Sequence, residues 1–251
     1  MHVRALQRSA ESSSGGVLAG ALASLSLALA GCGPSARPAA PPAPVAAPAQ
    51  ASQGLHYRLD PGRSDLRILV FRGGPLARLG HSHVLVASGL SGELWLGTAT
   101  APGRFEVTVP VAGLLVDAPA ARAAEGEEFA SVPSAADVEG TRRHLLEPGQ
   151  LDAVAYPTLR VSGTLSALPG SGIAHALVEV KARVATLEVP VEASLAADGA
   201  LSVSGGFSVL QSALGLVPYS VGLGALQVRD ELQIRFRLVA VADSGAAARI
   251  P

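Results

Sequence analysis

Two histidines separated by a single residue are the feature of the sequence that most suggests chemistry. His81 and His83 lie two positions apart, and on a β-strand that spacing directs both imidazoles to one face, which suits metal binding. A metal site would need a third ligand, for which His144, His56 and Asp60 are the candidates. The alternative, which we favour, is a pair of exposed or hydrogen-bonded histidines at the rim of the fold.

Sequence motifs of catalysis are absent from the chain. It contains no G-x-S-x-G nucleophile elbow, no H-E-x-x-H zinc motif, no P-loop and no complete G-x-G-x-x-G. The single cysteine, Cys32, excludes an intrachain disulfide, a C-x-x-C redox pair and a zinc site built from cysteines. The sequence therefore predicts a protein that is not an enzyme and requires no cofactor.

The composition excludes some classes of binding partner. The 251 residues carry a formal net charge of -1, and 49% are hydrophobic whereas 16% are charged. This balance excludes a polybasic nucleic-acid-binding protein and a disordered acidic chain. The 28 glycines and 18 prolines favour many turns over long helices. We expect a monomer with a sizeable core and no nucleic-acid partner.

The N-terminus has the pattern of an export signal. Arg4 and Arg8 precede an uncharged run of 14 residues, 17–30, which is shorter than the roughly 20 residues of a membrane span but typical of a secretory signal. The run ends in Leu29-Ala30-Gly31-Cys32, which resembles a bacterial lipobox and implies cleavage before Cys32 and lipidation of its thiol. The alternative is an ordinary signal peptide followed by a buried cysteine.

The lipobox also suggests where the protein resides. In lipoproteins of this type an Asp after the cysteine signals retention in the inner membrane, so Gly33 indicates an outer-membrane lipoprotein that faces the periplasm. The acyl chains on Cys32 would be its contact with the membrane. The predicted divisions are a signal peptide at 1–31, the lipidated cysteine with a Pro/Ala-rich linker at 32–54, one folded domain at 55–243 and a tail at 244–251.

Strict alternation predicts that the domain consists of β-strands. Between Leu226 and Leu238, apolar and polar residues alternate, and only Asp230 breaks the pattern, where a bulge or turn would fit. Shorter runs of this kind occur at 66–70, 105–109, 159–161, 176–184 and 201–203. Gly-rich segments at 73–74, 170–172 and 205–206 would separate them, and Asp198-Gly199 is a hairpin signal.

One segment interrupts the strands. Residues 120–148 are rich in Ala and Glu, and Ser134 with Asp137 resembles a capping box ahead of a short helix that ends near Glu147. The sequence therefore predicts an all-β fold of about eight strands, an antiparallel barrel or a sandwich, with a short helical insertion. A barrel of this size is just wide enough to hold a small ligand. On the predicted helix, Arg142, Arg143 and His144 form a cationic cluster that we expect to face solvent.

Three segments resemble the YceI-like family in order and spacing. Tyr57–Ser64 resembles the opening Y-x-[IL]-D-P-x-H-S of that family, with Arg63 in place of the histidine, and the strand at 65–71 follows. His144-Leu145, Asp152 and Tyr156-Pro157-Thr158 resemble its H-L and D-x-x-x-Y-P-T stretch. The strand at 228–241 resembles its closing V-x-D-E-[VL]-x-I-x-[FV]. The chain departs from the family at Gly80–His83 and at 211–225.

The resemblance implies a lipocalin-like barrel that binds a polyisoprenoid, a quinone or another lipid without catalysis. An apolar ligand needs a dry tunnel with few polar groups, and the apolar faces of the strands would line it. The predicted wall residues are Phe105, Val107, Val109, Leu159, Val161, Phe207, Val209, Ile234 and Phe236. Two other functions stay open: an envelope metal-binding module with His81 and His83 as ligands, and a structural lipoprotein whose barrel is filled by its own side chains.

Overall fold

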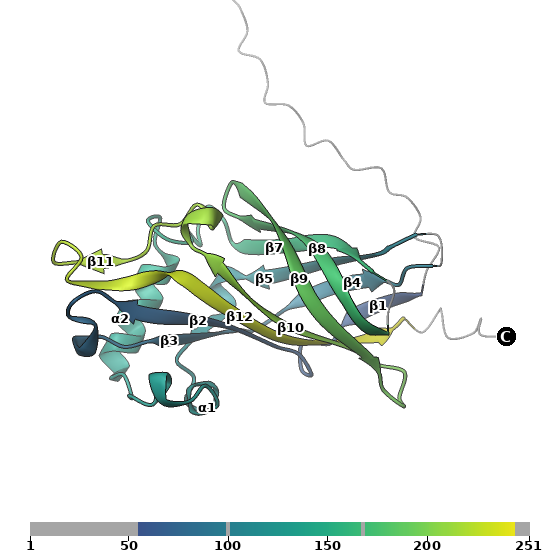
Figure 1. Ribbon diagram of the computed structural model, residues 1–251, viewed down its shortest axis with the longest axis horizontal. Helices are drawn as coiled ribbons and strands as arrows, with labels where there is room; N and C mark the ends of the chain where they lie inside the picture. The colour runs from purple at the N-terminus through teal and green to yellow at the C-terminus, as the bar shows by residue number, and fades with distance from the viewer. Residues whose placement is uncertain (1–54, 99–100, 167–168, 244–251) are drawn as a thin grey trace, which may run out of the picture. The chain divides into compact units, whose positions relative to one another are not determined.

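The structure, a computed structural model, describes residues 55–98, 101–166 and 169–243. The predicted signal peptide, Cys32, the linker and the tail lie outside the described residues. The described chain forms one antiparallel sheet (Figure 1). Its strands are β1 (His56–Leu59), β2 (Asp65–Gly73), β3 (His83–Ala87), β4 (Ser91–Trp95), β5 (Gly103–Pro110), β6 (Leu114–Val116), β7 (Thr158–Leu165), β8 (Gly170–Val180), β9 (Arg183–Leu195), β10 (Leu201–Leu210), β11 (Ser220–Val221) and β12 (Leu226–Ala242).

Eight of these strands close into a barrel, which is one of the two architectures that the alternation left open and the one that the family resemblance implied. The order is β1-β4-β5-β7-β8-β9-β10-β12, and β1 closes the ring because it pairs with both β4 and β12. Closure leaves these strands without a free edge at that end of the molecule.

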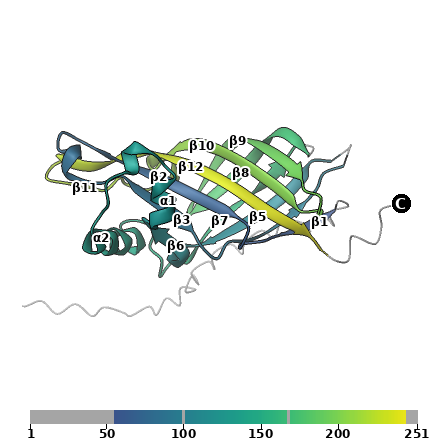
Figure 2. The same ribbon diagram turned by 90° about the horizontal axis from the view of Figure 1, so that it is seen from below.

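Toward the other end of the barrel, β2, β3 and β6 continue the wall. β12 pairs with β1 through residues 240–242 and then with β2, whose neighbours are β3 and β6. The helix α2 (Ala135–Leu146) lies beside β6 (Figure 2). Arg142 attaches it there, donating hydrogen bonds to the carbonyl oxygens of Leu114 (2.9 Å) and Ala112 (3.1 Å). Arg142 therefore does not simply face solvent, as its sequence context had suggested.

The rest of the insertion covers the outer face of β2 and β3. It contains α1 (Pro119–Ala123) and the short 3-10 helix η3 (Glu127–Phe129). Leu69 and Val84 are fully buried although they point away from the barrel interior, because Ala121 and Phe129 pack on them. Three other 3-10 turns are η1 (Ala77–Leu79), η2 (Val111–Gly113) and η4 (Ser212–Leu214).

Several local predictions are confirmed. The alternating segment is β12, and its register shifts between Val228 and Leu232, around Asp230. Asp198 and Gly199 lie in the turn that joins β9 to β10. Helix α2 begins with a full capping box, in which the Ser134 hydroxyl accepts from the Asp137 N–H and the Asp137 carboxylate accepts from the Ser134 N–H.

Two other local predictions are wrong. The alternating run at 176–184 is not one strand, because the chain reverses at Lys181 (φ +55°) between β8 and β9. The glycines at 205–206 do not separate strands but lie inside β10, and Gly170 and Gly172 lie inside β8. A Cβ on Gly205 would lie 2.7 Å from Cζ of Phe236 on the neighbouring strand, so this glycine makes room for an aromatic ring.

Among the helices of residues 55–98, 101–166 and 169–243, none has the length and apolar character needed to span a bilayer.

Candidate functional site

The barrel encloses an apolar cavity of about 590 Å³, which is within the usual range of ligand pockets. Because side chains alternate along a strand, one face of each strand lines this cavity. On β12, for example, Phe236 lies inside, whereas its neighbours Arg235 and Arg237 are exposed. The nine wall residues predicted from the sequence all line the cavity: Phe105, Val107, Val109, Leu159, Val161, Phe207, Val209, Ile234 and Phe236.

A packed cluster closes the cavity at the end that contains β1 and β4 (Figure 1). Tyr57 of β1 and Leu94 of β4 are both buried there, and Leu201 is 1% exposed. Phe105 and Phe236 pack against this cluster and also line the cavity. The cavity therefore ends against tightly packed side chains at one end of the barrel.

The polar lining residues gather at the opposite end, where β2, β11 and α2 lie. One face of α2 borders the cavity there through Ala136, Asp137, Gly140, Thr141 and His144, which follow helical spacing. The remaining polar residues lie on neighbouring loops and strand ends; they are Arg72, His81, His83, Gln150, Gln211, Tyr219 and Gln227. The cavity thus combines an apolar interior with a polar mouth.

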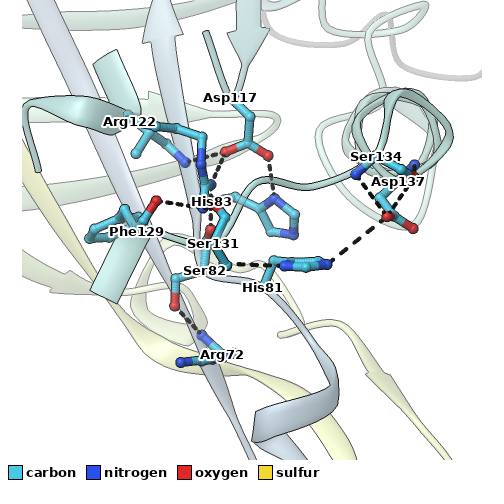
Figure 3. Close-up of polar contacts among 11 residues, drawn as sticks. Arg72, His81, Ser82, His83, Asp117, Arg122, Phe129, Ser131, Ser134 and Asp137 are labelled. Carbon is cyan, nitrogen blue, oxygen red and sulfur yellow. Dashed lines mark hydrogen bonds and ion pairs between the residues drawn. The ribbon is translucent and has the colours of Figure 1, made fainter. Parts of the chain in front are cut away.

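A buried hydrogen-bond network holds His83 at this mouth (Figure 3). The Nδ1 atom of His83 lies 2.6 Å from Oδ2 of Asp117, and the other carboxylate oxygen accepts from the Val84 N–H at 2.9 Å. Arg122 donates to Oδ1 of Asp117 at 2.6 Å and also binds the carbonyl oxygens of Ser82, Phe129 and Ser131. The His83 ring is therefore held by the Asp117 carboxylate, which is itself held by the Val84 N–H and Arg122.

The Asp117 carboxyl stays ionised despite its burial. Burial by itself raises the pKa of this group, but hydrogen bonds from His83, the Val84 N–H and Arg122 outweigh it, so the pKa lies below its ordinary value. Asp117 also has a φ of +54°, which is uncommon for a residue with a side chain. The local backbone therefore adopts an unfavourable conformation in the arrangement that holds His83.

A second polar group lies beside the first. The hydroxyl of Ser82 donates to the Glu128 carboxylate at 2.6 Å, and Arg72 binds the same carboxylate at 3.3 Å. The Ser82 hydrogen bond, opposed by burial and reinforced by Arg72, lowers the pKa of Glu128. Arg72 also donates to the carbonyl oxygen of Gly80 at 3.1 Å. Arg72 and Arg122 therefore already have anionic and carbonyl partners.

The two predicted histidine ligands both reach the cavity, but the described residues bring no metal site together around them. The ring centroids of His81 and His83 lie 6.4 Å apart. His81 contacts the Ser131 hydroxyl at 3.3 Å, and its Nε2 lies 4.0 Å from Asp137. Within residues 55–98, 101–166 and 169–243, no group of three or more His, Cys, Asp or Glu residues could hold a metal ion.

The three candidate third ligands lie in different surroundings. His144 lines the mouth, where the centroids of its ring and the Tyr219 ring lie 4.9 Å apart. Its Nδ1 lies 3.1 Å from Oε2 of Glu147. His56 stacks on Trp95 in β4, at the packed end of the barrel. Asp60 accepts a hydrogen bond from Gly62 in the turn after β1 and does not line the cavity.

Sequence reasoning missed Asp117, Arg122 and Glu128. They belong to the insertion between β6 and α2, in which no periodic pattern marks individual side chains. Arg235 of β12 is exposed and pairs with Glu125, whose side chain is 2% exposed and also binds Arg67. A charge reversal at 235 would therefore break an ion pair to a buried carboxylate.

Comparison with known proteins identifies the fold. No protein-family model matches the sequence, and no curated protein matches it. Among solved structures, Burkholderia cenocepacia BcnA matches with a TM-score of 0.52 and 17% identity, over 73% of this chain and 99% of that one. A polyisoprenoid binding domain from Saccharophagus degradans matches with a TM-score of 0.51 and 11% identity, over 75% of this chain and 99% of that one.

The YCEI protein of Campylobacter jejuni has a TM-score of 0.42 with 13% identity, over 63% of this chain and 83% of that one. At these low identities the similarities to BcnA and to the polyisoprenoid binding domain establish the fold alone. The described chain has the antiparallel barrel fold of these two proteins.

Proposed function

We propose that the protein binds a hydrophobic chain, such as a polyisoprenoid, a quinone or another lipid, in its barrel cavity and does not transform it. The observation that carries this proposal is the cavity itself, which is apolar along the strands, closed by packed side chains at one end and polar at the other. This arrangement suits a ligand with a long apolar tail and a small polar head. The similarity to a polyisoprenoid binding domain supports the proposal.

The volume of the cavity favours ligand binding over a barrel filled by its own side chains. Small residues on β8, Ala174 and Ala176, line the wall where larger side chains would fill the interior. Glycines are placed so that phenylalanine rings lie against the wall rather than across the lumen. A Cβ on Gly163 would lie 3.0 Å from Cζ of Phe105, and Gly205 relates to Phe236 in the same way.

We also propose that the protein acts at the bacterial envelope, anchored by a lipid on Cys32. The rim of the mouth supports this proposal, because its loops expose large apolar side chains. Leu79 is 65% exposed, Val217 is 72% exposed and Leu223 is fully exposed. The segment 212–228, which carries two of them, contains no charged residue. An apolar rim around the opening suits exchange of a lipid with a membrane.

Native mass spectrometry of the protein purified from its bacterial host would test lipid binding. A Cys32→Ser chain, which cannot be lipidated, should be released from the membrane and carry one extractable lipid for each protein. A chain that carries no lipid and takes up none on exposure to lipid vesicles would contradict the proposed binding function. Unchanged membrane fractionation of Cys32→Ser, with no palmitate labelling of the wild-type protein, would contradict the proposed anchor.

A further inference from the structure

We propose that His83 accepts a hydrogen bond from a hydroxyl group on the head of the bound ligand. The site would then select a chain-bearing alcohol or quinol over the corresponding phosphate or quinone. This inference rests on the proposed function, because it assumes that the apolar tail lies in the cavity. It adds to that function the chemical class of the head group.

The position of the ring proton follows from the partner of His83. An ionised carboxylate can only accept hydrogen bonds, so the Nδ1 atom that lies 2.6 Å from Asp117 carries the proton. In the neutral imidazole, Nε2 is then an acceptor. Figure 3 shows this atom on the side of the ring away from Asp117, toward His81. Within the described part of the chain, no side chain or backbone group donates to it.

The acceptor is held in place before any ligand binds. The side chains of Asp117 and Arg122 are 1% and 7% exposed, and the His83 side chain is 14% exposed. Rotation of the ring would break its bond to Asp117 and leave a buried carboxylate with one partner fewer. A preorganised acceptor loses little conformational entropy on binding. It therefore favours a ligand that can donate, which a hydroxyl does and a quinone carbonyl cannot.

The charges around the mouth disfavour an anionic head. Three carboxylates lie near the mouth, those of Asp117, Glu128 and Asp137, and the nearby guanidinium groups already have partners. Arg72 and Arg122 bind Glu128 and Asp117, and Arg229 lies over the Phe71 ring near Glu128. Hydrogen bonds from the Ser134 side chain and backbone lower the pKa of Asp137, so this carboxylate at the rim stays ionised. A phosphate would meet three carboxylates and guanidinium groups that already have partners.

A binding experiment with matched probes tests the inference. The full Cys32→Ser chain is freed of lipid and titrated with farnesol, farnesyl monophosphate and the hydrocarbon farnesene, which share one tail and differ in the head. We expect farnesol to bind about tenfold more tightly than farnesene, which is the upper end of what one hydrogen bond contributes to affinity. Farnesyl monophosphate should bind more weakly than farnesol. Dialysis against EDTA should leave this order unchanged.

Variants then assign the preference to one atom. In His83→Phe the ratio of the affinity for farnesol to the affinity for farnesene should fall to about one. His175→Phe, on the outer wall with a side chain 58% exposed, should keep that preference. If His83→Phe does not fold, a comparison of ubiquinol-1 with ubiquinone-1 on the His83 protein gives the same test, with the quinol expected to bind more tightly.

Distinct results would overturn the inference or the function beneath it. Tighter binding of the phosphate or of the quinone, or a preference that requires added Zn²⁺, would overturn the role of His83 and leave lipid binding intact. Failure of all three farnesyl probes to bind would instead contradict the proposed function.

Discussion

The Nη1 atom of Arg122 lies 2.6 Å from Oδ1 of Asp117, and both side chains are almost completely shielded from solvent. Removing one partner of such a pair leaves an uncompensated buried charge. Arg122 also binds three carbonyl oxygens, so it joins the insertion to the start of β3. The pair thus connects the stability of the insertion to the position of His83.

Replacement of the guanidinium should therefore be costly. We expect Arg122→Met to lower the free energy of unfolding by about 3–5 kcal/mol, measured by urea denaturation. Arg237→Gln, on the exposed face of β12, should change it by about 0.5 kcal/mol or less. Equal effects of the two substitutions would show that the buried pair does not stabilise the fold. The double variant Arg122→Met with Asp117→Leu should be less destabilised than the two single changes added together.

Acid should weaken the same network. Because the folded pKa of Asp117 lies below its ordinary value of 3.8, this group adds stability above that value and loses it as the pH falls through the folded pKa. The difference in unfolding free energy between the wild type and Asp117→Asn should therefore shrink as the pH falls below about 4. Urea titrations at several pH values measure it. A difference that grows with acid would contradict the assigned sign.

A carboxylate inside the cavity should abolish lipid uptake. Phe236 lines the lumen near its packed end, so Phe236→Glu places a charge in apolar surroundings at a penalty of several kcal/mol. We expect loss of bound lipid in native mass spectra and a lower melting temperature. The exposed neighbour Arg237→Gln is the matched control and should retain both. Similar behaviour of the two variants would mean that the strand register is wrong, since a shift by one residue exchanges the faces.

Two glycines should respond in opposite directions to alanine. A Cβ on Gly205 would lie 2.7 Å from both the Phe236 ring and the Pro190 carbonyl oxygen, so Gly205→Ala should lower the melting temperature and move the ring into the lumen. A Cβ on Gly140 in α2 meets nothing within 4 Å. Gly140→Ala should therefore stabilise the protein by up to about 1 kcal/mol. Thermal melts of both variants decide the sign of each effect.

The strands and the inner wall could be predicted from the sequence because both depend on a period of two, whereas the closed barrel was implied by the family resemblance. Phe105, Val161 and Ile234 could be assigned to the cavity from parity alone. Gly205 was wrongly assigned to a turn, because the sequence alone does not distinguish a glycine in a turn from a glycine that makes room for a ring on the next strand. The mouth could not be predicted for a related reason. Asp117 meets His83 across 34 positions, and no periodic pattern connects residues of an irregular insertion with a strand.

The closed end of the cavity sets a limit on how far a bound chain could extend into the barrel. Under the proposed function, a chain that enters tail first would stop against the cluster around Tyr57 and Leu201, so its length would decide where its head comes to rest. Only a tail that fills the distance from this cluster to the mouth would place its head beside His83. A longer tail would leave the head outside, and a shorter one would draw the head into apolar surroundings. In the proposed binding mode, the closed end would therefore make selection of the head group depend on the length of the tail.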